Sequence, residues 1–369
     1  MHKLMASVTI LEHELSELRL LVERQAGILL DCPNSALAAH VAEYLESQEL
    51  DSPGALLARL RGADQDPSAL PAFLDGVLNV STGFFRHPGA MNALAQYVVP
   101  QLYARKSEDG PCTLRIWSAG CCTGEEAYSI AMALCDVLPG SNGSVNGSAN
   151  GNASGNGSGA KEKSAAGRNG IIAENSAPAP VTQTTKDWSV HIVGTDLLRS
   201  AIEVAERGLY PQSALAGLPP ATIRACFTKI GSIGAGQNGS KGGNLNDSNS
   251  NGATTGSAAA LNNVSNGTAH LLVKPRLRSL VTFNTMNLIK PVYIGRFDCI
   301  FCMDVLPHLS RAQRTALLER LHLYLEPGGY LFLSQTEKLC TPNLNFRSET
   351  YDGYTFHRKP MAASAAYGR

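Results

Sequence analysis

Residues 115–134, RIWSAGCCTGEEAYSIAMAL, place chemically useful side chains directly after a turn. An apolar run stops at Gly120, the sequence Cys-Cys-Thr-Gly follows, and two adjacent acids, Glu125 and Glu126, come next. Glycine lets a backbone bend and approach a ligand closely because it has no Cβ. The spacing matches neither a GxGxxG fingerprint nor a P-loop, and two carboxylates at a helix start would repel a phosphate. They suit a cationic or hydroxyl-rich ligand.

Asp196 gives a second indication, because it ends the strand-like run WSVHIVGTD. A carboxylate at the end of the second strand of an α/β unit can accept hydrogen bonds from ribose hydroxyls. S-adenosylmethionine carries an ammonium, a ribose diol and a sulfonium, so it satisfies both indications. The competing interpretation is that Glu125 and Glu126 only complement the positive end of a helix dipole. The residues by themselves leave both interpretations open.

The composition of the chain disfavours several classes of protein. Its 369 residues include 31 Lys and Arg against 31 Asp and Glu, and this balance gives no reason to expect nucleic acid as a partner. No apolar run approaches the roughly 20 residues that cross a bilayer, and acids occur too early for a secretory signal, so we expect no direct membrane insertion. The nine cysteines are scattered, and the single C-x-x-C spacing, at Cys299 and Cys302, lies within an apolar run. This indicates reduced thiols in a cytoplasmic protein and no metal site.

Two segments differ from the rest in composition. Residues 140 to about 186 and 231 to about 268 are dominated by Gly, Ser, Asn and Ala. Such segments bury too little apolar surface to offset the entropy of ordering, so we interpret both as flexible insertions. Without them roughly 280 residues remain, enough for one large and one small domain.

The first part of the chain, residues 1 to about 90, predicts a small all-helical domain, because it contains no strand pattern. We expect Asn34 or Ser35 to cap the second helix and Asp51 or Ser52 to cap the third. Apolar residues recur at helical spacing in the first helix, at Leu11, Leu15, Leu18 and Val22.

The rest of the chain alternates strand-like and helix-like runs, which predicts an α/β fold with a doubly wound, mainly parallel sheet. Ligands of such sheets bind at the carboxyl ends of the strands, where Gly120 and Asp196 lie. A final extended run covers 346–358, and residues 327–329 are expected to form a turn before the strand that follows. The predicted strands are 114–119, 188–196, 280–288, 297–306 and 330–334, and the predicted helices are 124–138, 197–207 and 311–325.

Five motifs follow one another along the chain. They are STGFFR, RIWSAGCCTGEEAYSIAM, VGTDLLRSAIEVAERGLYP, LVTFNTMNL, and FDCIFCMDVLPHLS with LHLYLEPGGYLFLSQTEKL. Together they resemble the motifs of the CheR-type chemotaxis receptor methyltransferases, over about residues 10–358 apart from the two insertions. The resemblance implies a Rossmann-like class I methyltransferase domain at 91–358, preceded by the helical domain at 1–90, with a small β-subdomain and a tail at 359–369.

The resemblance also implies S-adenosyl-L-methionine as the cofactor, with S-adenosyl-L-homocysteine as the product. Asn287 and Leu288 match an Asn-Leu pair that flanks the adenine. The implied cofactor-binding residues are Thr82, Arg86, Gly120, Glu126, Asp196, Asn287, Leu288, Met303 and Asp304.

Two residues, Arg86 and His308, are implied beside the transferred methyl and are interpreted as catalytic. The family methylates glutamate carboxylates on a chemoreceptor. A carboxylate is ionised at neutral pH, so alignment and removal of water matter more than a general base. Arg86 is expected to orient the carboxylate through a charge-assisted hydrogen bond, and His308 to contact the substrate or line the pocket. Without the resemblance, Arg86 beside aromatic residues would be interpreted as half of a structural ion pair.

The chain departs from the family pattern at several positions. Val80 occupies the place of an Asn that usually precedes the matched threonine by two residues, and Asn79 lies one step away. Met303 and Asp304 stand where the family usually has Arg-Asn, and His308 where it usually has Tyr. Asp in place of Asn keeps an acceptor and loses a donor. These departures bear on the substrate more than on the cofactor.

The implied partner is a chemoreceptor or a receptor-like protein. In the family the second helix is often rich in Lys and Arg, whereas SALAAHVAEYLES contains neither, which favours a different partner surface or a different substrate. The β-subdomain is expected to contain strands at 226–230 and 270–277, with the second insertion at the hairpin tip. A loop tip tolerates insertions, although this one could hinder or replace the capture of a receptor peptide.

Three functions remain open at this point. The first is an S-adenosylmethionine-dependent methyltransferase that acts on glutamate side chains of a chemoreceptor. The second is a methyltransferase for another protein or a small molecule, which Asp304, His308 and the non-basic second helix favour. The third is a cofactor-binding signalling module with weak catalysis. Transfer of a labelled methyl group to a receptor fragment, with a base-labile product, distinguishes all three.

Overall fold

The computed structural model describes most of the chain outside the two predicted insertions. The described residues are 10–62, 66, 68–78, 82–109, 113–135, 137, 188–230, 269–290, 292–339 and 344–361. The insertions at 140–186 and 231–268, the departure at Asn79 and Val80, and most of the predicted tail therefore lie outside the described residues.

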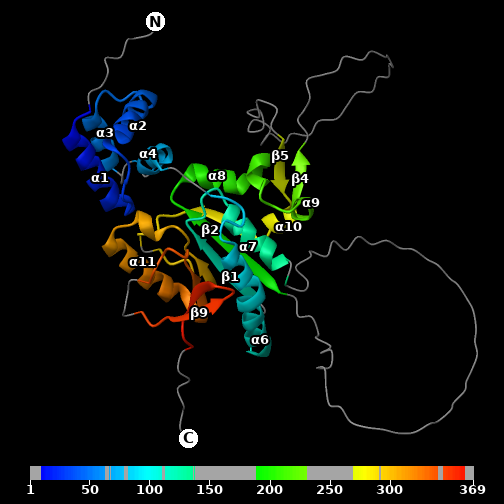
Figure 1. The fold of residues 1–369 in the computed structure, drawn as a ribbon. Coiled ribbons are helices and arrows are strands. Elements are labelled where there is room, and N and C mark those ends of the chain that lie inside the picture. The colour runs from blue at the N-terminus through cyan, green and yellow to red at the C-terminus, as the bar shows by residue number, and fades with distance from the viewer. Residues whose placement is uncertain are drawn as a thin grey trace, which may run out of the picture.

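Four helices form the N-terminal part of the described chain: α1 (Glu12–Ala26), α2 (Asn34–Ser47), α3 (Pro53–Arg61) and α4 (Ala69–Val77). Ser52 caps α3 as predicted, since its Oγ accepts a hydrogen bond from the backbone N of Ala55 at 3.2 Å. The predicted cap of α2 is wrong, because Asn34 is already helical and Pro33 precedes it without a side-chain cap. Leu11 is half exposed at the start of α1 and does not join Leu15 on the buried face. In Figure 1 the four helices form the blue group beside α8 (Arg199–Arg207).

A seven-stranded sheet forms the centre of the molecule, and the predicted doubly wound α/β fold is confirmed. Its order is β6-β2-β1-β7-β8-β10-β9, and all neighbours are parallel except β10, which is antiparallel to both of its neighbours. The strand order reverses between β1 and β7, so the carboxyl ends of these two strands border the place where such sheets bind ligands. The strands are β1 (Thr113–Ala119), β2 (Ser189–Asp196), β6 (Val281–Thr285), β7 (Phe297–Phe301), β8 (Leu325–Phe332), β9 (Arg347–Tyr351) and β10 (Tyr354–Arg358).

Both faces of the sheet are covered by helices. Alternate residues of β1 point to opposite faces: Leu114 and Ile116 join one apolar cluster, and Trp117 and Ala119 join another. The first cluster includes residues from α5 (Pro88–Ala93), η1 (Leu94–Val98), α6 (Val99–Asp109) and α7 (Glu125–Cys135), and the second includes α11 (Arg311–Tyr324). Figure 1 shows α6 and α7 on one side of the strands and α11 on the other.

Two predicted strands are shorter than expected. β6 ends at Thr285 and β7 at Phe301, where the predictions continued to 288 and 306. After β7 the chain leaves the sheet, because Asp304 adopts a left-handed φ of 58° and a short 3-10 helix, η4 (Leu306–His308), follows. The apolar residues of these extensions line a cavity or are buried in the core without belonging to β6 or β7.

Two further predictions at the C-terminal side need correction. Residues 327–329 lie within β8, where the register to β7 shifts, and do not form a separate turn. The extended run at 346–358 is a hairpin of β9 and β10, whose turn residues Asp352 and Gly353 both have positive φ. That geometry is typical of a two-residue hairpin turn.

The predicted β-subdomain is a separate three-stranded antiparallel sheet. Its order is β3-β5-β4, with β3 (Leu209–Pro211), β4 (Phe227–Ile230) and β5 (His270–Val273). β3 was not predicted, and β5 ends before the predicted 277 because α10 (Pro275–Arg278) begins there. η2 (Gln212–Leu215) and α9 (Pro220–Cys226) connect β3 to β4. Among the described helices, none is long and apolar enough to cross a membrane.

Candidate active site

A cavity of about 410 Å³ opens at the carboxyl ends of the central strands. The turn after β1, the end of β2 and the segments after β6 and β7 all contribute to its wall, together with the segment before α5. All ten residues that the family resemblance implied line it: Thr82, Arg86, Gly120, Glu126, Asp196, Asn287, Leu288, Met303, Asp304 and His308. Their individual roles stay predictions.

The turn after β1 is built around Gly120. The backbone N of Gly120 and that of Cys121 both donate to the carbonyl oxygen of Thr195, at 2.8 and 2.9 Å, which ties the turn to the end of β2. Gly120 has a φ of +84°, and a Cβ there would lie 2.6 Å from the Cγ2 atom of Val305. Glycine is therefore required here by a neighbouring side chain as well as by the backbone conformation. Gly124 is required for the same two reasons, since its φ is +94° and a Cβ there would lie 2.7 Å from the Ala205 Cβ.

The two adjacent acids have different surroundings. The Glu125 side chain is buried and accepts a hydrogen bond from the Thr123 hydroxyl at 2.7 Å. Burial raises its pKa, and hydrogen bonds from Thr123 and Thr82 lower it in part. Glu126 lines the cavity, and burial raises its pKa to about 7. Within the described chain only Ser118 hydrogen-bonds the Glu126 carboxylate, through Oε1 at 2.6 Å, so Oε2 remains for a ligand donor.

Asp196 connects the turn to the helix that follows β2. Its Oδ2 accepts from the backbone N of Cys122 and its Oδ1 from that of Leu198, both at 2.9 Å. Burial raises the pKa of Asp196, and these backbone donors oppose the shift. Each carboxylate oxygen has a further lone pair for a ligand hydroxyl. The neighbouring thiol is not a nucleophile at neutral pH, because burial and the nearby Asp196 raise the pKa of Cys122 to about 12.

Ser129 of α7 positions the segment that carries Arg86. Its hydroxyl accepts a hydrogen bond from the backbone N of Phe85 at 2.9 Å and donates to the carbonyl of Glu125 at 2.6 Å. Phe85 has a positive φ of 52°. This strained residue turns the chain so that Thr82 and Arg86 both reach the cavity.

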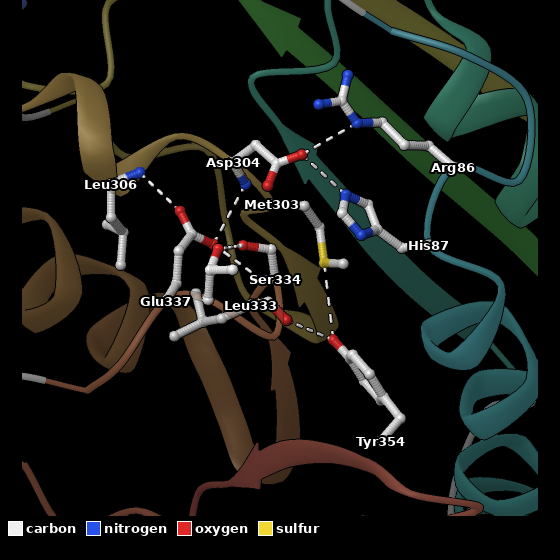
Figure 2. Close-up of polar contacts among 10 residues, drawn as sticks. Arg86, His87, Met303, Asp304, Leu306, Leu333, Ser334, Glu337 and Tyr354 are labelled. Atoms are coloured by element: carbon white, nitrogen blue, oxygen red, sulfur yellow. Dashed lines mark hydrogen bonds and ion pairs between the residues drawn. The ribbon is translucent and has the colours of Figure 1, made fainter.

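Asp304 brings two cationic or potentially cationic side chains to the opposite wall. Its Oδ2 lies 3.2 Å from the Arg86 Nε and 2.9 Å from the His87 Nε2. Figure 2 shows the Asp304 carboxylate between these two side chains, which come from a segment more than 200 residues earlier in the chain. The sequence-based alternative for Arg86, a structural ion pair, is thus present together with its place at the cavity.

Behind Asp304, the buried carboxylate of Glu337 accepts three backbone hydrogen bonds. Oε1 accepts from Leu306 N at 2.9 Å, and Oε2 accepts from Ser334 N at 2.8 Å and from Asp304 N at 3.2 Å. Nearby, the Tyr354 hydroxyl donates to the Leu333 carbonyl at 2.6 Å and lies 3.7 Å from the Met303 sulfur. Figure 2 shows these contacts.

The helical N-terminal part closes the remaining side of the cavity. Ala26, Ile28 and Leu78 line it. Backbone pairing joins the two parts, since Leu29 N donates to the His308 carbonyl at 2.8 Å.

The side chain of Asn287 makes a second connection to the same helices. Its Nδ2 donates to the Gln25 carbonyl, and its Oδ1 accepts from Ile289 N, both at 3.0 Å. The side-chain amide is thus engaged within the protein. One N–H and one acceptor lone pair of the amide remain for a ligand.

Three residues of this site were missed by the sequence analysis: His87, Ser129 and Glu337. Ser129 carries no sequence signal, because its role depends on the turn of a helix against a distant segment. Glu337 follows a buried strand within SQTEKL, and a carboxylate at that place is the same signal that identified Asp196. Within the described part of the chain, no group of three or more His, Cys, Asp or Glu side chains is placed to hold a metal ion.

A comparison with protein families identifies part of the chain. Residues 80–148 and 257–354 match the model of the CheR methyltransferase, SAM binding domain. The match begins just before the segment of Thr82 and Arg86 and ends at the hairpin of β9 and β10. It includes the turn after β1 and the segments after β6 and β7, so most of the cavity wall lies within it.

Curated relatives extend this similarity over most of the chain. The chain is 26% identical to chemotaxis protein methyltransferase 1 of Pseudomonas aeruginosa, over 90% of this chain and 96% of that protein. It is 25% identical to chemotaxis protein methyltransferase Cher2 of Pseudomonas putida, over 91% of this chain and 98% of that protein. It is 24% identical to chemotaxis protein methyltransferase 1 of Vibrio cholerae, over 91% of this chain and 92% of that protein.

Proposed function

The chain carries a CheR-type methyltransferase domain that uses S-adenosylmethionine, and from this premise we propose that it methylates glutamate side chains of a chemoreceptor or receptor-like protein in chemotaxis-type signalling. The observation that carries the proposal is the convergence of Glu126, Asp196 and Arg86 on one cavity. We place this activity in the cytoplasm, where the signalling parts of chemoreceptors lie.

The cavity has the donors and acceptors that the cofactor requires. The Glu126 carboxylate has an oxygen without a described partner for an ammonium, and Asp196 offers acceptor lone pairs for a ribose diol. Leu197, Met286 and Leu288 line the same cavity and can contact an adenine ring through apolar surface. Together these residues form a site for a positively charged nucleoside and a poor site for a phosphate.

In the proposed mechanism the protein aligns the acceptor and removes water from it. The cofactor, when bound, supplies a methyl group activated by a sulfonium. Arg86 binds the incoming carboxylate through a charge-assisted hydrogen bond and points one oxygen at the methyl group. The acceptor is already ionised at neutral pH, so no side chain has to remove a proton. His308, at the exposed edge of the cavity, contacts the incoming side chain.

A transfer assay tests the proposed function. The purified chain is incubated with methyl-labelled S-adenosylmethionine and a cytoplasmic fragment of a chemoreceptor, and the labelled protein is then treated with base. A glutamate methyl ester releases its label as methanol, and a receptor fragment with its acceptor glutamates changed to alanine serves as the control. The absence of base-labile label on the receptor, with cofactor bound, would contradict the proposal.

The pairing of Asp304 with Arg86 favours a second candidate function. The Arg86 Nε already lies 3.2 Å from an internal carboxylate, which lowers the attraction of Arg86 for an acceptor carboxylate. The second candidate is therefore methyl transfer to a neutral nucleophile on another protein or a small molecule. A base-stable labelled product would identify it. A third candidate, a cofactor-binding signalling module with weak catalysis, would bind the cofactor and yield no labelled product.

A further inference from the structure

We infer that Glu337 is a positioning residue of this site, because its carboxylate fixes the segment 303–308 in the conformation that brings Asp304 to Arg86 and His87. The inference rests on the proposed function, since it takes the cavity to be the cofactor site. It adds a residue to which the family resemblance gave no role.

Glu337 accepts hydrogen bonds from three backbone N–H groups. A buried backbone N–H without an acceptor is costly. After β7 leaves the sheet, Asp304 N and Leu306 N donate to Glu337 rather than to a neighbouring strand, and Ser334 N does the same after β8. Glu337 is only 9% exposed. One carboxylate therefore joins the ends of two adjacent strands.

Asp304 has an unusual backbone conformation. Its φ of 58° lies in the left-handed region, which Asp tolerates better than most residues but which still needs support from its surroundings. The hydrogen bond from Asp304 N to Glu337 supports it from behind. In Figure 2 the Asp304 carboxylate then points away from Glu337 and toward Arg86 and His87.

The segment 303–308 that Glu337 holds also forms a wall of the cavity. Met303, Asp304, Val305 and His308 all line it. Val305 also fills the space next to Gly120 on the opposite wall. A shift of this segment would therefore alter both the charged side of the cavity and its contact with the turn after β1.

The role of Glu337 requires a carboxylate and not an amide. An ionised carboxylate only accepts hydrogen bonds, whereas an amide presents one acceptor and one NH₂ donor. In Glu337→Gln the NH₂ group must face at least one of the three backbone N–H groups, whichever way the amide is turned. The substitution keeps the size of the side chain and removes part of its acceptor capacity.

Asp298 provides a matched control. Its side chain is 2% exposed, and its Oδ2 accepts from Arg115 N at 2.9 Å and pairs with Lys106 Nζ at 2.7 Å. It lies at the start of β7, away from the end that borders the cavity, and it does not line the cavity. Asp298→Asn therefore disturbs a buried carboxylate of the same sheet without touching the site.

Isothermal titration with S-adenosylhomocysteine, together with thermal melting, tests the inference on the full chain. Binding by the unchanged protein checks the cofactor site on which the proposed function depends, so a failure of the function and a failure of the inference are separate results. We expect Glu337→Gln to weaken the affinity about tenfold and Asp298→Asn to change it less than about twofold, even where both lower the melting temperature. Glu337→Asp keeps an acceptor-only group at shorter reach, and we expect a loss of about threefold. It serves as the test variant if Glu337→Gln cannot be purified.

A double variant tests whether Glu337 acts through the segment of Asp304. Where two residues act as one unit, their effects do not add. In an Asp304→Ala background we expect Glu337→Gln to cost less than about twofold in affinity. Three results would overturn the inference: affinity unchanged in Glu337→Gln, an equal loss in Asp298→Asn at the same melting temperature, or fully additive effects in the double variant.

Discussion

The two walls of the cavity are built in different ways. On one side, the turn after β1 is tied to the adjacent β2 by backbone hydrogen bonds and by Asp196, and glycine allows its conformation. On the other side, no strand of the described residues pairs with the segment of Asp304, which depends on charged or titratable side chains from distant parts of the chain, His87, Arg86 and Glu337.

This difference indicates which wall can change the substrate specificity. The first wall depends on backbone geometry and on contacts between neighbouring strands, so it suits a constant task such as holding a cofactor. The second wall depends on side-chain charges that single substitutions alter. It contains Met303, Asp304 and His308, the positions where the sequence resemblance implies a departure from the family pattern. We expect changes on the second wall to affect methyl transfer most and changes on the first to affect cofactor binding and stability.

The largest effect is expected from Arg86→Ala. Loss of the charge-assisted contact to the acceptor should lower methyl transfer at least about a hundredfold, while the melting temperature stays within a few degrees because the side chain is 42% exposed. The transfer rate of Arg86→Lys, which keeps the charge without the planar fork, should lie between the rates of the unchanged protein and of Arg86→Ala. The measurement is the rate of label transfer, and full activity of Arg86→Ala would remove this residue from the mechanism.

Glu126→Gln should have the next largest effect, on cofactor binding. Removing the charge that faces the ligand ammonium should weaken S-adenosylhomocysteine binding about tenfold. In the unchanged protein the affinity should rise as the pH increases through about 7 and level off above it, because burial raises the pKa of Glu126 to about 7 and only the ionised form attracts an ammonium. Calorimetry at several pH values checks both, and a pH dependence that survives in Glu126→Gln would contradict the assignment.

The same residue predicts an opposite trend in the stability of the ligand-free protein. The folded state binds the Glu126 proton more tightly than the unfolded chain does, since its pKa is about 7 against a usual 4.5. The free energy of unfolding should therefore contain a contribution that falls as pH rises from 4.5 to about 7. Denaturant unfolding of the protein and of Glu126→Gln over this range measures it, and a difference between them that does not change with pH would refute it.

Gly120→Ala tests the contact between the two walls. The positive φ and the Val305 side chain at 2.6 Å from the added Cβ should together cost about 2 kcal/mol of unfolding free energy. Gly217→Ala is the control, because a Cβ there meets nothing within 4 Å, and it should change stability by less than about 0.5 kcal/mol. Denaturant titration compares the unfolding free energies of the two variants. Equal losses of unfolding free energy would mean that the two walls are not in close contact at Gly120 and Val305.

The smallest effect on binding is expected from Glu125→Gln. This carboxylate is bonded within the protein and does not line the cavity, so the affinity for S-adenosylhomocysteine should change less than about twofold, with a stability loss of about 1 kcal/mol. A loss of affinity as large as that of Glu126→Gln would show that both acids contact the ligand.

The first wall could be predicted from the sequence because its signals are local. A glycine after an apolar strand, two acids at a helix start and an aspartate at the end of the next strand are all visible in short stretches, and strand-helix alternation places them at one edge of the sheet. The residues alone did not distinguish Glu125 from Glu126, and only the family resemblance selected Glu126. That distinction depends on the rotation of α7 about its axis, and a single helix start contains no information about it.

The second wall could be predicted only in part. The resemblance indicated Met303, Asp304 and His308, but the partners of Asp304 lie more than 200 residues away at His87 and in another loop at Glu337. Such contacts depend on how strands are ordered in the sheet. The strand lengths were predicted wrongly for a related reason. Apolar residues that line the cavity or are buried in the core have the same pattern as residues that continue a strand: Met286, Leu288, Met303 and Val305 line the cavity, and Cys302 and Leu306 are in the core.

Calorimetric titration of the unchanged protein with S-adenosylhomocysteine tests most directly whether the cavity between the two walls is a cofactor site. We predict a single saturable site with one ligand per chain. A titration without saturable heat, at protein and ligand concentrations that detect micromolar binding, would contradict it.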